Sequence, residues 1–137
     1  MRTPLLFSAL IVLAGCTSSS EDSAPAPTQE DPAPAMQTLD AMPEAFRGRW
    51  DLSEEGCTDE SSEMRLLIAA DTATFYGSRA QITAIEAQGE QALIADHRFS
   101  GEDETWDERL AYELSEDGER LTVETADGSL SIRMRCP

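Results

Sequence analysis

Residues 110–136 read LAYELSEDGERLTVETADGSLSIRMRC, and this stretch decides the fold. Two Asp-Gly pairs, Asp117-Gly118 and Asp127-Gly128, separate three runs in which apolar and polar residues alternate. Asp-Gly favours a tight hairpin turn, because glycine adopts a positive φ at no steric cost. The stretch therefore predicts three antiparallel strands that are joined by two hairpins.

Alternation assigns one face of these strands to the core. The predicted inward residues are apolar, and the residues between them, such as Ser131, Arg133 and Arg135, are predicted to face solvent. The inward set consists of Leu110, Tyr112, Leu114, Leu121, Val123, Leu130, Ile132, Met134 and Cys136.

Upstream of this stretch the chain predicts further short strands, around residues 50–53, 64–69, 73–76, 80–86 and 93–99. The segment Asp103–Ser115 fits a helix through Trp106, Leu110 and Leu114, and it fits a strand almost as well. We favour a strand there, because the following hairpin needs a partner. About eight short strands joined by short turns predict an all-β domain, a small antiparallel up-and-down barrel.

The N-terminus carries a different signal. An apolar run after Arg2 ends in Leu13-Ala14-Gly15-Cys16, and it is shorter than the roughly 20 residues that a membrane-spanning helix needs. This pattern resembles the lipobox of bacterial lipoproteins. The resemblance implies cleavage before Cys16, acylation of Cys16 (by palmitate, for example), and, because Thr17 rather than Asp follows, residence at the periplasmic face of the outer membrane. An ordinary secretory signal with an incidental cysteine is the alternative.

The predicted organisation has three parts: a signal peptide at 1–15, a lipidated cysteine with a disordered tether at 16–41, and a β-barrel domain at 42–137. The tether is rich in Ser, Ala, Pro and acidic residues, which bury too little apolar surface to offset the entropy of ordering. Cys57 and Cys136 remain as a pair in an oxidising compartment, and we expect a disulfide between them. Closing a loop of about 80 residues is worth about 4 kcal/mol. The alternative, a redox pair, lacks Cys-x-x-Cys spacing.

The formal net charge is −17, and the chain contains no lysine. Such a surface argues against nucleic acid and against docking on anionic lipid, whereas it favours a cationic partner electrostatically. A charge that serves only solubility, or adaptation to a salty habitat, is the alternative explanation.

Two further resemblances concern the barrel. Phe46-Arg47-Gly48-Arg49-Trp50 is similar to the Gly-x-Trp stretch of lipocalins, in which an arginine from a late strand stacks on the tryptophan. The resemblance implies that Arg133 or Arg135 takes that part. Size, acidity, anchor and the place of Cys136 also resemble the periplasmic lysozyme-inhibitor barrels and other small proteobacterial lipoproteins. The inhibitor signatures are not present, so no inhibitory residues carry over.

The sequence predicts a non-enzymatic binding module with no cofactor and no metal site. No nucleophile elbow occurs, and the acidic runs lack the spacing of a calcium loop. His97 and Glu108 both occupy predicted inward positions. A proton-transfer pair is one interpretation, and a buried polar pair is the more common one. The expected ligand is a cationic envelope protein, for which a lysozyme-like protein is one candidate; the alternative is a small apolar ligand. The candidate binding residues are Trp50, Tyr76, Arg79, His97, Trp106 and Glu108.

Overall fold

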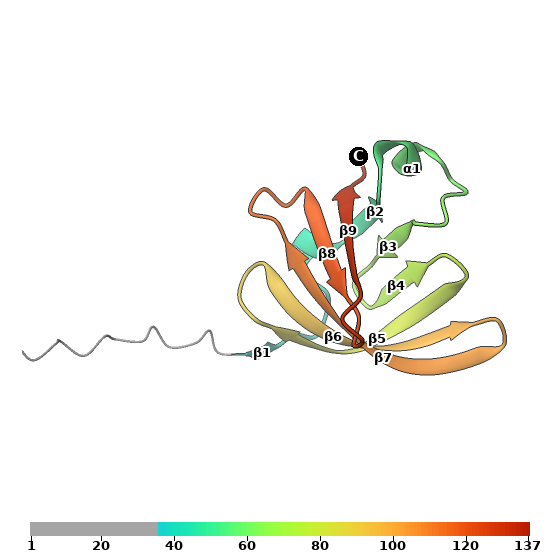
Figure 1. The fold of residues 1–137 in the computed structure, drawn as a ribbon. Helices are drawn as coiled ribbons and strands as arrows, with labels where there is room; N and C mark the ends of the chain where they lie inside the picture. Colours follow the sequence, from blue (N-terminus) through green and yellow to red (C-terminus); the bar gives the residue numbers. More distant parts are fainter. Residues whose placement is uncertain (1–35) are drawn as a thin grey trace, which may run out of the picture. The chain divides into compact units, whose positions relative to one another are not determined.

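The computed structural model describes residues 36–137, which form nine strands and two short helical segments. Figure 1 shows these elements in chain order, coloured from blue to red. The elements are β1 (Gln37–Thr38), the 3-10 helix η1 (Glu44–Phe46), β2 (Gly48–Asp51), α1 (Glu54–Thr58), β3 (Leu66–Ile68), β4 (Thr72–Phe75), β5 (Ser78–Ala87), β6 (Ala92–Gly101), β7 (Glu104–Leu114), β8 (Arg120–Glu124) and β9 (Leu130–Arg135).

Strands β2 to β9 form a closed antiparallel barrel, in which each strand pairs with its neighbours in the chain and β9 returns to β2. The predicted eight-strand up-and-down barrel is therefore confirmed. Strand β1 adds to β5 outside this ring, through the pairs Gln37↔Ala87 and Thr38↔Glu86. This paired segment lies within the range predicted as a tether, and Cys16 lies outside the described residues. No helix among the described residues has the length and hydropathy to cross a membrane.

Both Asp-Gly pairs lie in hairpin turns, as predicted, with positive φ at Gly118 (72°) and Gly128 (83°). The aspartates stabilise these turns through their side chains. Asp117 accepts hydrogen bonds from the Ser115 hydroxyl and the Glu119 N–H, at 2.5 and 3.0 Å. Asp127 does the same with Thr125 and Ser129. The segment with two possible periodicities, residues 103–115, contains strand β7, so the strand prediction is confirmed.

The barrel interior is filled by apolar side chains at the end opposite to the β6–β7 turn. Trp50, Phe46, Met42 and Tyr112 are each at most 1% exposed. The remaining core residues are mostly aliphatic and extend toward the other end of the barrel: Leu66, Ile68, Ala73, Ala80, Ile82, Ile85, Leu93, Ala95, Phe99, Leu110, Leu114, Leu121 and Val123. One end of the barrel is thus a packed core.

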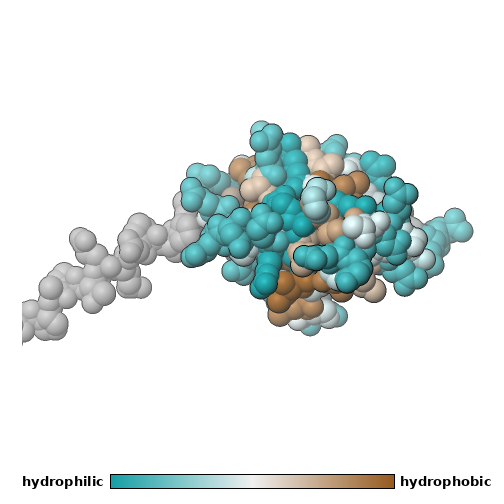
Figure 2. Space-filling model, turned by 90° about the horizontal axis from the view of Figure 1, so that it is seen from above, coloured by the Kyte–Doolittle hydropathy of each residue, from teal (hydrophilic) through white to brown (hydrophobic). Residues whose placement is uncertain are grey.

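The predicted inward and outward faces of β9 are wrong. The residues that were predicted to face solvent lie on the inner face, and the apolar residues between them lie on the outer face. Leu121 and Val123 are buried, and they pair with Arg133 and Ser131, so these polar residues share the inner face. Leu130 and Ile132 are instead 64% and 62% exposed. Figure 2 shows hydrophobic surface interrupting an otherwise largely hydrophilic face. The hairpin register fixes the face of β9, and it overrides the apolar pattern.

Two arginines on the inner face of β9 are stabilised by contacts with other parts of the barrel. Arg135 stacks on the Trp50 ring at 4.2 Å from its centroid and donates to the carbonyls of Ala45, Arg47 and Gly118. The tryptophan–arginine stack that the lipocalin resemblance implies is therefore present, and Arg135 supplies it. Arg133 reaches past the end of β2 and donates to the Met64 carbonyl.

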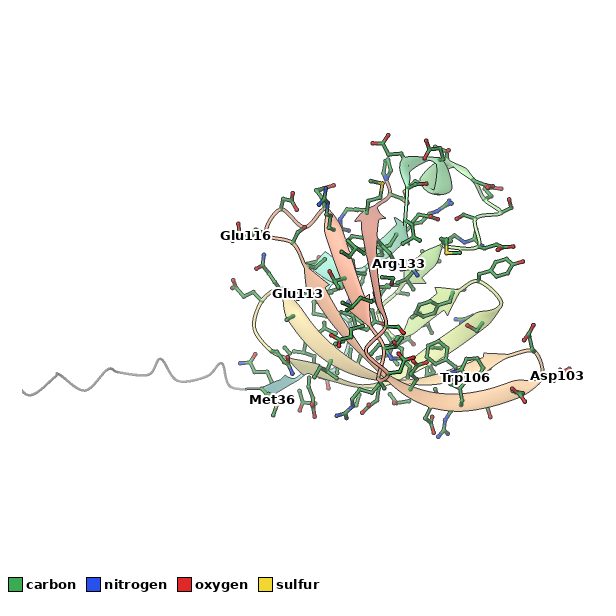
Figure 3. The ribbon with its side chains drawn as sticks, viewed as in Figure 1. Met36, Asp103, Trp106, Glu113, Glu116 and Arg133 are labelled. Carbon is green, nitrogen blue, oxygen red and sulfur yellow. A yellow bond between two sulfur atoms is a disulfide. The ribbon has the colours of Figure 1, made fainter. Side chains whose placement is uncertain are left out.

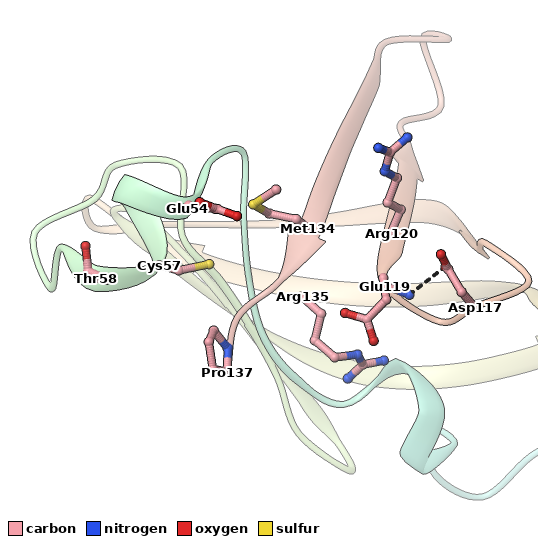
Figure 4. A pocket seen from close by; sticks show the side chains of 9 residues that line it. All are labelled: Glu54, Cys57, Thr58, Asp117, Glu119, Arg120, Met134, Arg135 and Pro137. Carbon is pink, nitrogen blue, oxygen red and sulfur yellow. Dashed lines mark hydrogen bonds between the residues drawn. The ribbon is translucent and has the colours of Figure 1, made fainter.

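The seam between β2 and β9 has only two paired positions, Trp50↔Arg135 and Asp51↔Met134. A disulfide lies beside this seam and joins Cys57 of α1 to Cys136, with 5.2 Å between their Cα atoms. The predicted disulfide is confirmed. Its surroundings form a surface hollow of about 520 Å³ that includes Glu54, Met134 and Arg135 (Figure 4). The disulfide thus fastens the first barrel strand region to the last.

Candidate functional site

The barrel opens at the end where the β4–β5 and β6–β7 turns lie. A cavity of about 350 Å³ occupies this end, and we call it the inner hollow. Half of its twelve lining residues are apolar or aromatic, four carry hydroxyl groups, one carries a carboxylate and one a guanidinium. The lining residues are Phe75, Ser78, Phe99, Trp106, Glu108, Leu110, Val123, Thr125, Ser129, Leu130, Ser131 and Arg133.

An aromatic series runs from the core to the mouth of the barrel. The Tyr112 and His97 ring centroids are 5.7 Å apart, and His97 is 5.7 Å from Phe99. Phe99 stacks on Trp106 with 5.1 Å between centroids and 5° between planes, and Phe75 lies 5.5 Å from Phe99. The stack holds Trp106 in place although its side chain is 41% exposed. Trp106 is therefore a preorganised aromatic surface at the mouth.

A second hollow of about 430 Å³ lies farther out, and we call it the outer hollow. It is lined by Tyr76, Gly77, Ser78, Gly101, Glu102, Glu104 and Trp106. Trp106 and Ser78 line both hollows, so the two adjoin, and we call them together the mouth groove. Figure 3 shows Trp106 and Asp103 at this end, away from Glu113 and Glu116 at the other.

The two turns that frame the outer hollow are in close contact. A Cβ atom added at Gly101 would lie 2.5 Å from the Gly77 carbonyl oxygen, so only glycine fits there. The β6–β7 turn is formed by Glu102 and Asp103, both at positive φ (49° and 65°). Such backbone is uncommon for residues other than glycine, and it concentrates at functional positions. The turn presents carboxylates where glycine would be the relaxed choice.

His97 is almost fully buried, and its hydrogen bonds hold it in one orientation. Nδ1 lies 3.0 Å from the Ala95 carbonyl oxygen, and Nε2 lies 2.9 Å from the Tyr112 hydroxyl. Because a carbonyl only accepts, Nδ1 carries the proton and Nε2 accepts from Tyr112. Burial lowers the pKa of His97 and raises that of the Tyr112 hydroxyl, which favours the neutral form of both rings. Glu108 is the cross-strand neighbour of His97, but the ring nitrogens of His97 contact the Ala95 carbonyl and the Tyr112 hydroxyl, and not the Glu108 carboxylate.

The six candidate binding residues fall into separate places. Tyr76, Trp106 and Glu108 line the mouth groove, and His97 lies beneath it in the aromatic series. Trp50 is buried under Arg135 at the packed end, where it stabilises the barrel. Arg79 is exposed and pairs with Thr74 and Ser100 outside the groove.

The outer face of β6 and β7 carries the two ion pairs found within residues 36–137. Arg98 pairs with Asp107 at 2.9 Å, and Arg109 pairs with Asp96 at 2.7 Å. Each arginine holds the pKa of its aspartate below the ordinary value. Among these residues, no group of three or more His, Cys, Asp or Glu side chains is placed to hold a metal ion.

Sequence reasoning missed Phe75, Phe99 and Arg133 as residues of the groove. Phe99 shares the inward period of Leu93, Ala95 and His97, so the pattern places it inside the barrel but not at the mouth. Arg133 was missed because β9 was assigned the opposite face. Comparison with protein-family models, with curated proteins and with solved structures gives no match for this chain.

Proposed function

We propose that this chain is an outer-membrane lipoprotein, anchored through Cys16, whose barrel binds a cationic protein of the cell envelope without catalysing a reaction. The mouth groove carries this proposal: the exposed aromatic rings of Tyr76 and Trp106 line one hollow together with the carboxylates of Glu102 and Glu104. Rings that are rigid and half-exposed are the usual anchors of protein interfaces. Carboxylates around them favour lysine and arginine side chains of a partner.

The charge of the whole chain supports the same partner. A formal net charge of −17 attracts a basic protein over long range and raises its rate of association. Exposed charge interactions are screened beyond about 8 Å at physiological ionic strength, so this attraction weakens as salt is added. A tether between Cys16 and the barrel would let the mouth reach partners at a distance from the membrane.

The test uses the full chain with Cys16→Ser, to avoid detergent, and a cationic lysozyme as the first probe. We expect binding at 50 mM NaCl that weakens at least tenfold at 300 mM. Glu102→Gln/Glu104→Gln should weaken lysozyme binding at least about fivefold, and the separate variant Trp106→Ala should weaken it by a larger factor. The matched control is Glu113→Gln/Glu116→Gln, which removes the same charge at the other end of the barrel (Figure 3). Equal losses in both double variants would show that total charge, and not the groove, is responsible.

Purification of the lipidated chain from its own membranes in mild detergent extends the test to unknown partners. Mass spectrometry should find a basic protein that salt releases. Retention of Trp106→Ala complexes under the same conditions would contradict docking at the groove.

A small apolar ligand is the second candidate, and the inner hollow favours it. Phe75, Phe99, Leu110 and Val123 surround about 350 Å³, which lies at the lower end of the range for small-molecule sites. Such a ligand would survive the same purification and would remain bound when the salt concentration is raised.

A further inference from the structure

Arg133 is the inward residue of β9 that the apolar pattern of the strand does not explain. It lies on β9 (Figure 3), pairs with the buried Leu121 and lines the inner hollow. Its Nη1 donates to the Met64 carbonyl. Its Nε is buried and has no hydrogen-bond partner among the described residues, and no bond to those residues uses Nη2. One edge of the guanidinium is therefore without an acceptor.

This guanidinium is partly desolvated, and the buried carboxylate of Asp51 acts on it without forming an ion pair with it. Burial lowers the pKa of Arg133, while the carboxylate of Asp51 and, more weakly, the Tyr112 hydroxyl act in the opposite direction. Within residues 36–137 Arg133 forms no ion pair, since the two pairs found there lie on the outer face of β6 and β7. A partly buried charge with an unused N–H is costly unless an acceptor satisfies it. Nε has no exposed surface, so Nη2 is the donor that remains for a charge-assisted hydrogen bond to a carboxylate in the hollow.

The remainder of the inner hollow fits the other part of a small acid. Phe75, Phe99 and Trp106 provide an aromatic wall, and Leu110 and Val123 lie deeper. Glu108 is the one carboxylate among the lining residues, and it stands between Trp106 and Leu110 on β7. Because Glu108 repels an anion on that side, a negatively charged group has one favourable position, at Arg133.

We propose that the inner hollow binds a small amphipathic carboxylate, with its head group on Arg133 and its apolar part against Phe75, Phe99 and Trp106. This inference rests on the second candidate function, that the hollow takes a small apolar ligand, and adds the charge of that ligand. It is independent of protein docking at the outer hollow, although Trp106 serves both.

The test compares sodium decanoate with decanol on the full chain carrying Cys16→Ser, by isothermal titration calorimetry below the micellar concentration. Both probes have the same apolar chain, so their ratio isolates the head group. We expect one decanoate per chain, bound at least tenfold more tightly than decanol. Equal affinities would leave the apolar site in place and overturn the carboxylate subsite. Failure of both probes to bind would overturn the apolar site together with the subsite.

Ser131 provides matched variants that leave the contact of Arg133 with Met64 in place. It is the preceding inward residue of β9 and lines the same hollow. Ser131→Glu supplies a carboxylate beside Arg133, whereas Ser131→Gln adds a side chain of the same size without charge. We expect Ser131→Glu to lose the tenfold preference for decanoate and to keep decanol binding at the level of Ser131→Gln. A preference that survives in Ser131→Glu would show that Arg133 does not bind the head group. Thermal unfolding of both variants confirms that each is folded.

Discussion

Removing the disulfide should open the barrel along one defined line. The β2–β9 seam has two paired positions, while β6 and β7 pair along their full lengths. The disulfide spans 79 residues of sequence beside this seam. In the chain-entropy model, a loop of that length restricts the unfolded chain by about 4.5 kcal/mol. A domain of this size has a total stability of about 5–15 kcal/mol, so the loss is a large share of it.

The assay is urea unfolding of Cys57→Ala/Cys136→Ala in the Cys16→Ser background, followed by circular dichroism and tryptophan fluorescence. We expect the free energy of unfolding to fall by about 4 kcal/mol relative to the oxidised parent. Reductant should lower the parent to the level of the variant and leave the variant unchanged. Trp50 lies at the seam, so its fluorescence emission should shift to longer wavelength at lower urea than the loss of the circular dichroism signal that the longer strands β6 and β7 contribute. A loss under about 1 kcal/mol would refute the argument that the disulfide compensates for a short ladder.

Three other predictions concern the mouth, the buried histidine and the anchor. Gly101→Ala places a Cβ 2.5 Å from the Gly77 carbonyl oxygen, so the two turns must separate; we expect a loss of about 1–3 kcal/mol in urea unfolding and weaker lysozyme binding, and an unchanged midpoint would contradict the close contact. Because burial lowers the pKa of His97, the unfolded chain binds a proton near its ordinary pKa of 6.5 that the native chain does not; the free energy of unfolding should fall between pH 7 and pH 5, by at most about 1.4 kcal/mol per pH unit. His97→Gln should flatten this slope when urea unfolding is measured at both pH values, and an unchanged slope would assign it to other groups. Cys16→Ser should release the protein into the soluble periplasmic fraction, whereas continued membrane retention would contradict the lipobox interpretation.

The barrel could be predicted from the sequence because its signals are local. Asp117-Gly118 and Asp127-Gly128 fix two hairpins, and the alternating residues between them name the strands. The disulfide followed from the count of cysteines and the expected compartment. The pairing of β9 with β2 joins residues that are far apart in sequence, and no local pattern specifies it. It followed only from the tendency of sequential hairpins to close on themselves.

The mouth groove was predictable only in part, for a related reason. Trp106 was named as a candidate binding residue because a large ring beside the acidic run 102–104 is conspicuous in sequence, and Tyr76 was named with it. Their convergence depends on the contact between Gly77 and Gly101, two glycines separated by a complete hairpin. Nothing in the sequence around either glycine distinguishes it from an ordinary turn residue. The site therefore forms only where the two turns pack together. The β4–β5 turn supplies Tyr76, and the β6–β7 turn supplies the carboxylates and Trp106.

Strand β9 shows why alternation alone is an incomplete guide to a barrel. Its apolar residues Leu130 and Ile132 face outward, because moving them inside would require a one-residue slip of the whole hairpin. Such a slip would also move Arg135 from the Trp50 ring and Arg133 from the Met64 carbonyl. The register that exposes Leu130 and Ile132 is thus the same register that places two guanidinium groups inside the barrel.

The two guanidinium groups differ in how well they are stabilised there. Arg135 is stabilised by its stack on Trp50 and by hydrogen bonds to three carbonyl groups. Arg133, which lines a cavity, has one such contact, and no bond to the described residues uses its Nη2. The same register that misled the sequence pattern therefore places a guanidinium with an unused Nη2 at a hollow with an aromatic wall, which is the feature that a bound carboxylate would explain.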